Sequence, residues 1–299
     1  MTSHDRLLLD GAMGTELRAR GVEVLDHITS IWSAAALVDA PEAVTSVHRD
    51  YIEAGADVIT INNYAVTRPL LARESMEDRF EKLTTIATEL GRRARDEAGR
   101  EVRLAGSLPP LATSYRPGEV GDDDDILTQY REMAALLAPE VDLLLCETLS
   151  SAREARAAAT AACETGKPVW LSWTLQGRHP NQLPSGETIE DAFSAIADLE
   201  IAAYLVNCCG ANFVTAAIPR LLSLTDRRVG GYANAADTLP ADEGDPEIAP
   251  ERIPRTALDV EGYAGAAGRW LAAGASVIGG CCSTRPDHTR RLRRLIDEN

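Results

Sequence analysis

The amino-acid sequence predicts a single-domain (β/α)8 barrel, a TIM barrel of the α/β class, over residues 1–299. Eight short apolar runs alternate with segments of helical periodicity along the chain. The length fits as well, because one such barrel typically needs about 250 residues. With 45% hydrophobic residues, the chain also has enough apolar side chains to fill one large core.

Each apolar run is nearly continuous, which is typical of parallel strands that are buried on both faces. The runs are RLLLD (6–10), DVITIN (57–62), VRLAGS (102–107), VDLLLC (141–146), PVWLSWT (168–174), AAYLVN (202–207), RVGGYA (228–233) and ASVIGG (275–280). Strands that alternate with helices in this way predict a closed parallel barrel.

The segments between the runs have the apolar spacing of helices. The clearest are 41–56, 75–99 and 150–166. We expect the last of these helices to stop at Gly166. The pattern of helix, Ala-Gly-Ala and strand occurs in both YIEAGADVITIN (51–62) and WLAAGASVIGG (270–280), which favours one architecture throughout the chain.

Two further segments are acidic. We expect ADTLPADEGDPEIAPERIP (236–254), which is also rich in proline, to form a long exposed loop. GDDDD (121–125) is expected to be a solvated loop that leads into a helix. A calcium site is the alternative there, but the segment lacks the spacing of a calcium-binding loop.

The charge of the chain bears on its partners and its compartment. A formal net charge of −16 disfavours nucleic acid and anionic membranes as partners. The sequence shows no signal peptide and no apolar stretch long enough for a membrane span, so we expect a cytoplasmic protein. We also expect a monomer or a small homo-oligomer. In a reducing compartment, clustered cysteines are metal ligands or catalytic thiols more often than disulfides.

Four of the six cysteines form two adjacent pairs, Cys208-Cys209 and Cys281-Cys282, at the ends of two predicted strands. The active sites of barrel enzymes lie where the strands end, so these thiols are expected to converge. Gly279-Gly280 permits a bend that lets both cysteines of the second pair reach one ion. No glycine precedes the first pair, so we expect one cysteine to point inward, and we favour Cys208.

Three thiolates around Zn2+ would leave the fourth position of a tetrahedral site open. The alternatives are that these cysteines are small buried residues or form a disulfide or redox pair. A site with three thiolates is a weak Lewis acid, which disfavours hydrolysis and favours activation of a substrate thiol for alkyl transfer. The five histidines do not lie directly at strand ends, which agrees with an all-sulfur ligand set; they are His4, His27, His48, His179 and His288.

The strand ends carry the motifs LLLDGAMGTEL, GADVITINNY, LLCETL, VNC and GGCC. In these motifs the chain resembles the homocysteine S-methyltransferase family, and the similarity runs nearly end to end. The resemblance implies a methyltransferase (EC 2.1.1.-) in which Cys208, Cys281 and Cys282 bind zinc. It also implies that homocysteine sulfur accepts the methyl group, forming methionine.

An amino-acid substrate needs carboxylates for its ammonium group and hydrogen-bond donors for its carboxylate. The resemblance assigns Asp10 and Glu147 to the amino group, although each could instead cap a helix or close a turn. The backbone amides of Gly11 and Ala12 could bind the substrate carboxylate. Cys146 precedes Glu147 and is the alternative ligand at that strand end.

Two further residues follow from the resemblance. Betaine-type relatives carry a tyrosine close to the zinc, so Tyr64 could orient the sulfur or occupy the open position, with surface packing as the alternative. Asn234 matches the asparagine of the family's YPN motif. Ala233 stands where that motif has proline, a departure that bears on the predicted substrate contact of Asn234.

We expect a small onium methyl donor: S-methylmethionine, S-adenosylmethionine, betaine or a related sulfonium. The 299 residues are expected to leave no room for folate- or cobalamin-binding domains. The aromatic residues that could face a cationic donor are Trp32, Tyr115, Trp170 and Trp173. Trp170 and Trp173 have opposite parity on one strand, so we expect one of them to be core.

Other functions fit parts of the pattern. They are a non-catalytic protein that binds zinc or homocysteine, methyl transfer to a different thiol or a selenol, and a metal-independent hydrolase or lyase barrel. Metal content, turnover with homocysteine and the choice of acceptor separate these functions.

Overall fold

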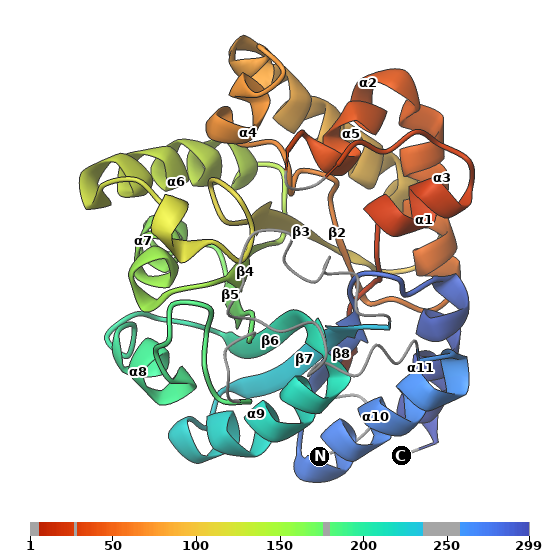
Figure 1. Cartoon of the computed structure of the whole chain (residues 1–299). Coiled ribbons are helices and arrows are strands. Elements are labelled where there is room, and N and C mark those ends of the chain that lie inside the picture. The colour runs from red at the N-terminus through yellow and green to blue at the C-terminus, as the bar shows by residue number, and fades with distance from the viewer. Residues whose placement is uncertain (1–5, 27–28, 176–179, 236–257, 299) are drawn as a thin grey trace.

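The structure, a computed structural model, describes residues 6–26, 29–175, 180–235 and 258–298. Eight parallel strands form the wall of a barrel, and helices surround it (Figure 1). The strands are β1 (Leu7–Leu8), β2 (Val58–Thr60), β3 (Arg103–Leu108), β4 (Leu143–Leu149), β5 (Val169–Trp173), β6 (Ala203–Gly210), β7 (Arg228–Asn234) and β8 (Val277–Gly280). Each lies within or overlaps one of the eight predicted runs, so the predicted fold class is confirmed.

The strands follow one another around the ring in chain order. β1 pairs with β8 in parallel, and a parallel bridge from Leu9 to Val58 links β1 to β2. β6 and β8 therefore flank β7, as expected for strands whose cysteines must converge.

Helices and short 3-10 turns connect the strands and cover the outer face of the barrel (Figure 1). They are α1 (Gly14–Ala19), η2 (Trp32–Ala35), α2 (Ala36–Asp39), α3 (Pro41–Glu53), α4 (Arg68–Ala72), η3 (Glu77–Arg79), α5 (Phe80–Glu97), η4 (Pro117–Glu119), α6 (Asp123–Leu137), α7 (Ala152–Cys163), α8 (Ile189–Ser194), α9 (Ala211–Leu224), α10 (Val260–Ala273) and α11 (Pro286–Asp297).

Glycines end several helices as predicted. Gly55, Gly166 and Gly274 have φ values of 106°, 74° and 114°, a left-handed conformation that glycine adopts without strain. The segment 121–125 was expected to be a loop that leads into a helix, but only residues 121–122 precede α6, and its last three aspartates form the first turn of that helix, which begins at Asp123. The predicted acidic loop 236–254 lies outside the described residues.

Side chains alternate between two buried layers, one inside the barrel and one between the strands and the helices. The interior layer consists of Leu9, Val58, Ala105, Leu143, Leu145, Trp170, Ala203, Leu205, Tyr232 and Val277. Trp173 belongs to the outer layer and stacks on Tyr204 with ring centroids 6.2 Å apart. Both tryptophans of β5 are thus core, whereas we had expected this of one. No helix among the described residues is long and apolar enough to cross a membrane.

Candidate metal centre and active site

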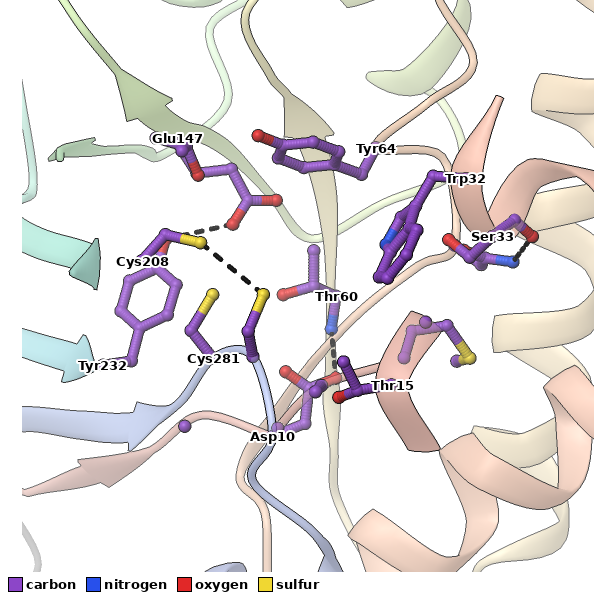
Figure 2. A pocket seen from close by; sticks show the side chains of 18 of the residues that line it. Asp10, Thr15, Trp32, Ser33, Thr60, Tyr64, Glu147, Cys208, Tyr232 and Cys281 are labelled. Carbon is purple, nitrogen blue, oxygen red and sulfur yellow. Dashed lines mark hydrogen bonds between the residues drawn. The ribbon is translucent and has the colours of Figure 1, made fainter. Parts of the chain in front are cut away.

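A pocket opens where the strands end, on the side that barrel enzymes use for catalysis. Acidic, aromatic and cysteine side chains from the ends of β1, β2, β4, β6, β7 and β8, and from the loop after β3, line it (Figure 2). Asp10, Tyr64, Glu147, Cys208, Cys281 and Cys282 all line this pocket. Residues predicted from distant parts of the sequence are therefore brought together.

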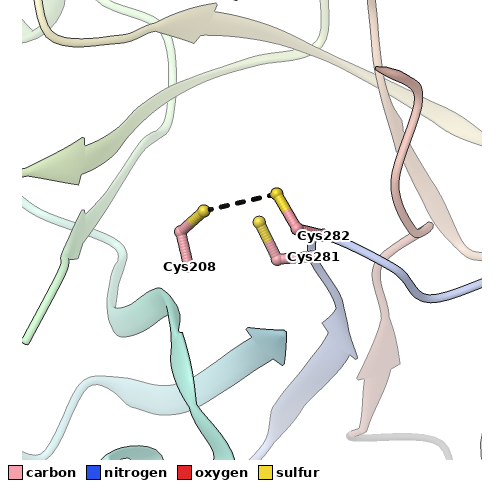
Figure 3. A group of neighbouring side chains, drawn as sticks. All are labelled: Cys208, Cys281 and Cys282. Carbon is pink, nitrogen blue, oxygen red and sulfur yellow. Dashed lines mark hydrogen bonds between the residues drawn. The ribbon is translucent and has the colours of Figure 1, made fainter. Parts of the chain in front are cut away.

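The three predicted cysteine ligands form one cluster (Figure 3). The sulfur atoms of Cys208, Cys281 and Cys282 all lie within 4.8 Å of one another, and Cys208 Sγ is 3.8 Å from Cys282 Sγ. A tetrahedral metal with metal–sulfur bonds of about 2.3 Å separates its sulfurs by about 3.8 Å. The thiols therefore already have the spacing of ligands to one metal ion.

The chemistry of the cluster also fits a cation. Hydrogen bonding to the Cys208 and Cys282 thiols, together with burial, raises the pKa of Cys281 well above its usual value. Three thiolates packed this closely repel one another, so the protein alone does not keep them ionised. A bound metal ion would supply the missing positive charge.

The second cysteine pair reaches the cluster through a turn. Thr284 N donates to Cys281 O at 3.1 Å, which closes a turn directly after β8. The predicted bend thus lies after Gly279 and Gly280, neither of which has a positive φ. They serve close packing instead: a Cβ on Gly279 would lie 2.5 Å from Leu9 Cβ, and one on Gly280 2.3 Å from Thr284 Oγ1.

In the first pair, Cys208 faces the pocket and Cys209 is buried in the outer layer. Cys208 has φ +54°. A left-handed conformation costs a non-glycine residue about 1–3 kcal/mol and persists where the surroundings fix it. Cys146 is also buried in the outer layer and does not line the pocket.

Two buried carboxyl groups lie beside the cysteines (Figure 2). Glu147 accepts hydrogen bonds from Ser107 Oγ at 2.6 Å and from Tyr232 Oη at 3.2 Å, and burial raises its pKa to about 7. Asp10 Oδ2 accepts from Thr60 N at 2.9 Å. Burial raises the pKa of Asp10 well above its usual value, and the charge of Glu147 adds to the effect. A cationic group bound between these carboxyls would relieve this electrostatic cost.

The backbone at Gly11 and Ala12 lines the same pocket. Ala12 N donates to Thr284 Oγ1 at 3.2 Å, so this amide already has a partner within the protein. A Cβ on Gly11 would lie 2.7 Å from Thr284 Oγ1 and from the Tyr51 ring. Gly11 is therefore required for this close packing, in addition to its predicted part in substrate binding.

Two tyrosines of the pocket, Tyr64 and Tyr115, differ in the partners of their hydroxyl groups. Tyr64 lines the pocket, but its hydroxyl pairs with Ser114 Oγ at 2.8 Å. Tyr115 Oη instead lies 2.9 Å from Cys208 Sγ. From the sequence, Tyr115 was predicted only as a candidate aromatic face, because nothing in its loop marks it as a neighbour of the cysteines.

Asn234 ends β7 and is buried, but it does not line the pocket. Neither its Oδ1 nor its Nδ2 has a hydrogen-bond partner among the described residues. Sequence reasoning missed Tyr232, two positions earlier, which contacts Glu147. The only signal for Tyr232 was its place two residues before Asn234, on the same side of the strand.

Of the candidate aromatic faces, Trp32 and Tyr115 line the pocket, whereas Trp170 and Trp173 do not. Trp32 has φ +46°, and the Arg18 guanidinium lies over its ring, 4.9 Å from the centroid. A Cβ on Gly14 would lie 2.3 Å from the Trp32 ring, so this glycine makes room for the indole.

Comparisons with known proteins agree with this site. The family model described as homocysteine S-methyltransferase matches residues 7–296. The chain is 32% identical to "Homocysteine S-methyltransferase" from Escherichia coli, with 98% of this chain and 96% of that protein covered. It is 27% identical to "Selenocysteine methyltransferase" from Astragalus bisulcatus, with coverage of 97% and 92%.

The metallated form of the homocysteine methyltransferase MmuM from Escherichia coli superimposes with a TM-score of 0.80, at 31% identity and coverage of 97% and 96%. The three converging cysteines and this metallated relative identify the cluster as a metal site. With its barrel, its three-cysteine centre and a family match over nearly its whole length, the chain belongs to the homocysteine S-methyltransferase family.

Proposed function

We propose that the protein transfers a methyl group from a small onium donor to the sulfur of homocysteine, forming methionine, with Zn2+ held by Cys208, Cys281 and Cys282. The observation that supports this most directly is the three-thiol cluster beside two buried carboxyls in one pocket. Homocysteine carries a thiol and an ammonium group, and the pocket has a candidate partner for each: the metal-binding cluster for the thiol, and Asp10 and Glu147 for the ammonium group.

The ligand set favours zinc among metals. Three thiolates with sulfur spacings near those of a tetrahedron are typical of zinc sites. When bound, zinc would supply the positive charge that lowers the pKa of thiols at this centre, including that of a substrate. The open side of the cluster faces the pocket rather than the core.

The protein's own residues would orient the amino acid. Asp10 and Glu147 accept the ammonium group, and both are ionised once this cation binds between them. Ser107 and Tyr232 donate to the two oxygens of Glu147 and fix the plane of its carboxylate. This arrangement holds the substrate sulfur toward the cysteines.

The donor would lie on the other side of the pocket. Trp32 and Tyr64 line the pocket and offer aromatic faces to an onium group, and Tyr115 lies between the donor and the cluster, with its hydroxyl 2.9 Å from Cys208 Sγ. Arg18 is the cation among the described residues that line the pocket. The proposed donors all carry a carboxylate, with which the Arg18 guanidinium would pair.

Methionine formation tests the proposal. The zinc-loaded protein is incubated with homocysteine and S-methylmethionine, S-adenosylmethionine, betaine or dimethylsulfoniopropionate, and the products are quantified. We expect turnover with at least one donor and none in Cys281→Ser. Zinc-loaded protein that forms no methionine with any of these donors would refute the proposal, and methylation of selenocysteine alone would identify a selenol acceptor instead.

We also propose that the protein acts in the cytoplasm, as a monomer or a small homo-oligomer. The three thiols at the cluster must stay reduced to bind metal, which agrees with a reducing compartment. Light scattering of the metal-loaded protein measures the oligomeric state directly.

A further inference from the structure

The end of β6 reverses the facing expected for its two cysteines. Along this strand Leu205 lies in the barrel interior and Val206 in the outer layer. Regular alternation would continue with Cys208 outward and Cys209 inward. The structure has the opposite arrangement, with Cys208 in the pocket and Cys209 in the outer layer.

A bulge in β6 causes this reversal. The pairing with β7 advances from Asn207 opposite Tyr232 to Gly210 opposite Asn234, so β6 contains one residue more than its neighbour. Cys208 has the left-handed φ of +54° at this point. An extra residue of this kind redirects the side chains that follow it.

β4 contains the same irregularity. Its pairing with β5 advances from Cys146 opposite Leu171 to Leu149 opposite Trp173, again with one extra residue. Thr148 occupies this bulge with φ +59° and lines the same pocket. Two left-handed, non-glycine residues thus stand at the mouth of the barrel, one on each side of β5.

The side chain of Asn207 joins the two bulges. Its Oδ1 accepts from Thr148 N at 2.9 Å and from Ser172 Oγ at 2.7 Å, and its Nδ2 donates to Thr148 Oγ1 at 2.9 Å. All three side chains are fully buried. Asn207 therefore ties the backbone next to Cys208 to the opposite bulge, with β5 between them.

We propose that Asn207 is a positioning residue that selects Cys208, and not Cys209, as the third metal ligand. It acts by fastening the bulge of β6 to Thr148 of β4, because a non-glycine residue keeps a left-handed conformation only where its surroundings hold it. Thr174 Oγ1 and Tyr115 Oη also donate to Cys208 O, at 3.3 Å and 3.4 Å. Without the Asn207 link only these longer bonds hold the bulge, and β6 can return to regular pairing, which turns Cys208 outward and Cys209 inward. The inference rests on the metal-binding part of the proposed function.

Cd2+ binding to the metal-free protein tests this inference, since the sulfur-to-metal absorption counts the thiolates bound to the ion. In Asn207→Ala we expect Cd2+ affinity to fall about 10- to 100-fold, the usual effect of losing a residue that orients metal ligands. We also expect the thiolate absorption that remains to depend on Cys209. Adding Cys209→Ser should remove one thiolate from the count in the Asn207→Ala background and none in the wild-type background.

A matched control separates positioning from general loss of stability. Leu83→Ala creates a cavity in the buried face of α5, far along the chain from both bulges, and should lower the melting temperature without changing Cd2+ affinity. Thr148→Val keeps the backbone bond but removes the hydroxyl bond, and should give a smaller loss of affinity than Asn207→Ala. This variant also serves if Asn207→Ala does not fold.

Three results would overturn the inference. The first is wild-type Cd2+ affinity in both Asn207→Ala and Thr148→Val. The second is a number of bound thiolates that does not depend on Cys209 in the Asn207→Ala background. The third is a loss of Cd2+ affinity in Leu83→Ala equal to that in Asn207→Ala. Wild-type protein that bound no Cd2+ at all would instead refute the metal site of the proposed function.

Discussion

Replacing Glu147 by glutamine tests the substrate site, because it removes the charge and keeps the shape. The Glu147 side chain is buried and accepts from Ser107 and Tyr232, both of which a glutamine can still engage. The ammonium group of homocysteine loses a charge-assisted hydrogen bond, worth about 1.5–3 kcal/mol. We therefore expect homocysteine to bind about 10- to 150-fold more weakly.

The pKa of Glu147 adds a pH dependence to this prediction. At a pKa of about 7 the carboxyl is half protonated in the free protein at pH 7, and only its ionised form pairs with an ammonium group. As the pH falls from 8 to 6, the wild type must release a proton on binding and loses affinity, whereas the glutamine variant has no such proton. The ratio of the two affinities should therefore shrink toward pH 6.

Calorimetric titration of the zinc-loaded proteins with homocysteine measures both effects, and zinc content should be equal. Glu154→Gln is the matched control, because Glu154 is a buried carboxyl that accepts from Leu111 N and Tyr130 Oη and does not line the pocket. It should leave homocysteine affinity unchanged. Equal affinity of wild type and Glu147→Gln at every pH would refute the assignment of Glu147 to the ammonium group.

Three further predictions concern the metal, the donor and stability. Cys281→Ser should lose bound zinc and methionine formation, whereas Cys209→Ser should keep most of both. Metal analysis and the activity assay measure the two effects. Equal losses in the two variants would contradict the ligand assignment. Arg18→Gln should raise the KM of the donor with little effect on that of homocysteine, and a change confined to homocysteine would contradict the donor assignment. His48 has no hydrogen-bond partner among the described residues, and burial lowers its pKa to about 4. The unfolded chain binds a proton at His48 below about pH 6.5, whereas the folded protein binds it only near pH 4. The free energy of unfolding should therefore fall by up to about 3 kcal/mol as the pH falls from 6.5 to 4. Urea unfolding of the metal-free protein at pH 7 and pH 4.5 should show most of this loss of unfolding free energy in the wild type and not in His48→Leu. An equal loss in the two proteins would contradict the role given to His48.

The fold was predictable because it depends on local patterns. Each strand of a parallel barrel is a short apolar run, and each helix has its own spacing and its own stop, so the pattern can be recognised one element at a time. Gly55 and Gly274 show why: both end helices in the left-handed conformation, at the places where Ala-Gly-Ala occurs in the sequence. The length of each element was less predictable, since β1 covers only Leu7–Leu8.

Parts of the site depend on contacts between distant segments, which local patterns do not contain. Tyr115 reaches Cys208 across 93 positions of sequence, from a loop without a recognisable motif. Asn234 matches a family motif, yet its side chain does not line the pocket. A residue type at a strand end therefore predicts proximity to the site, whereas the direction of its side chain depends on the neighbouring strands.

The choice between Cys208 and Cys209 illustrates this dependence. Alternation counted from Leu205 favours Cys209, because it assumes that the strand stays regular to its end. We favoured Cys208 from the sequence and the family resemblance agreed, but neither gave a physical reason. The reason lies in a neighbour: the bulge of β6 is bonded through Asn207 to a second bulge at Thr148, which directly follows Glu147. The thiol that binds metal and the carboxyl that would bind the substrate's ammonium group are thus positioned by one buried connection, so a change at Asn207 should disturb both sites together.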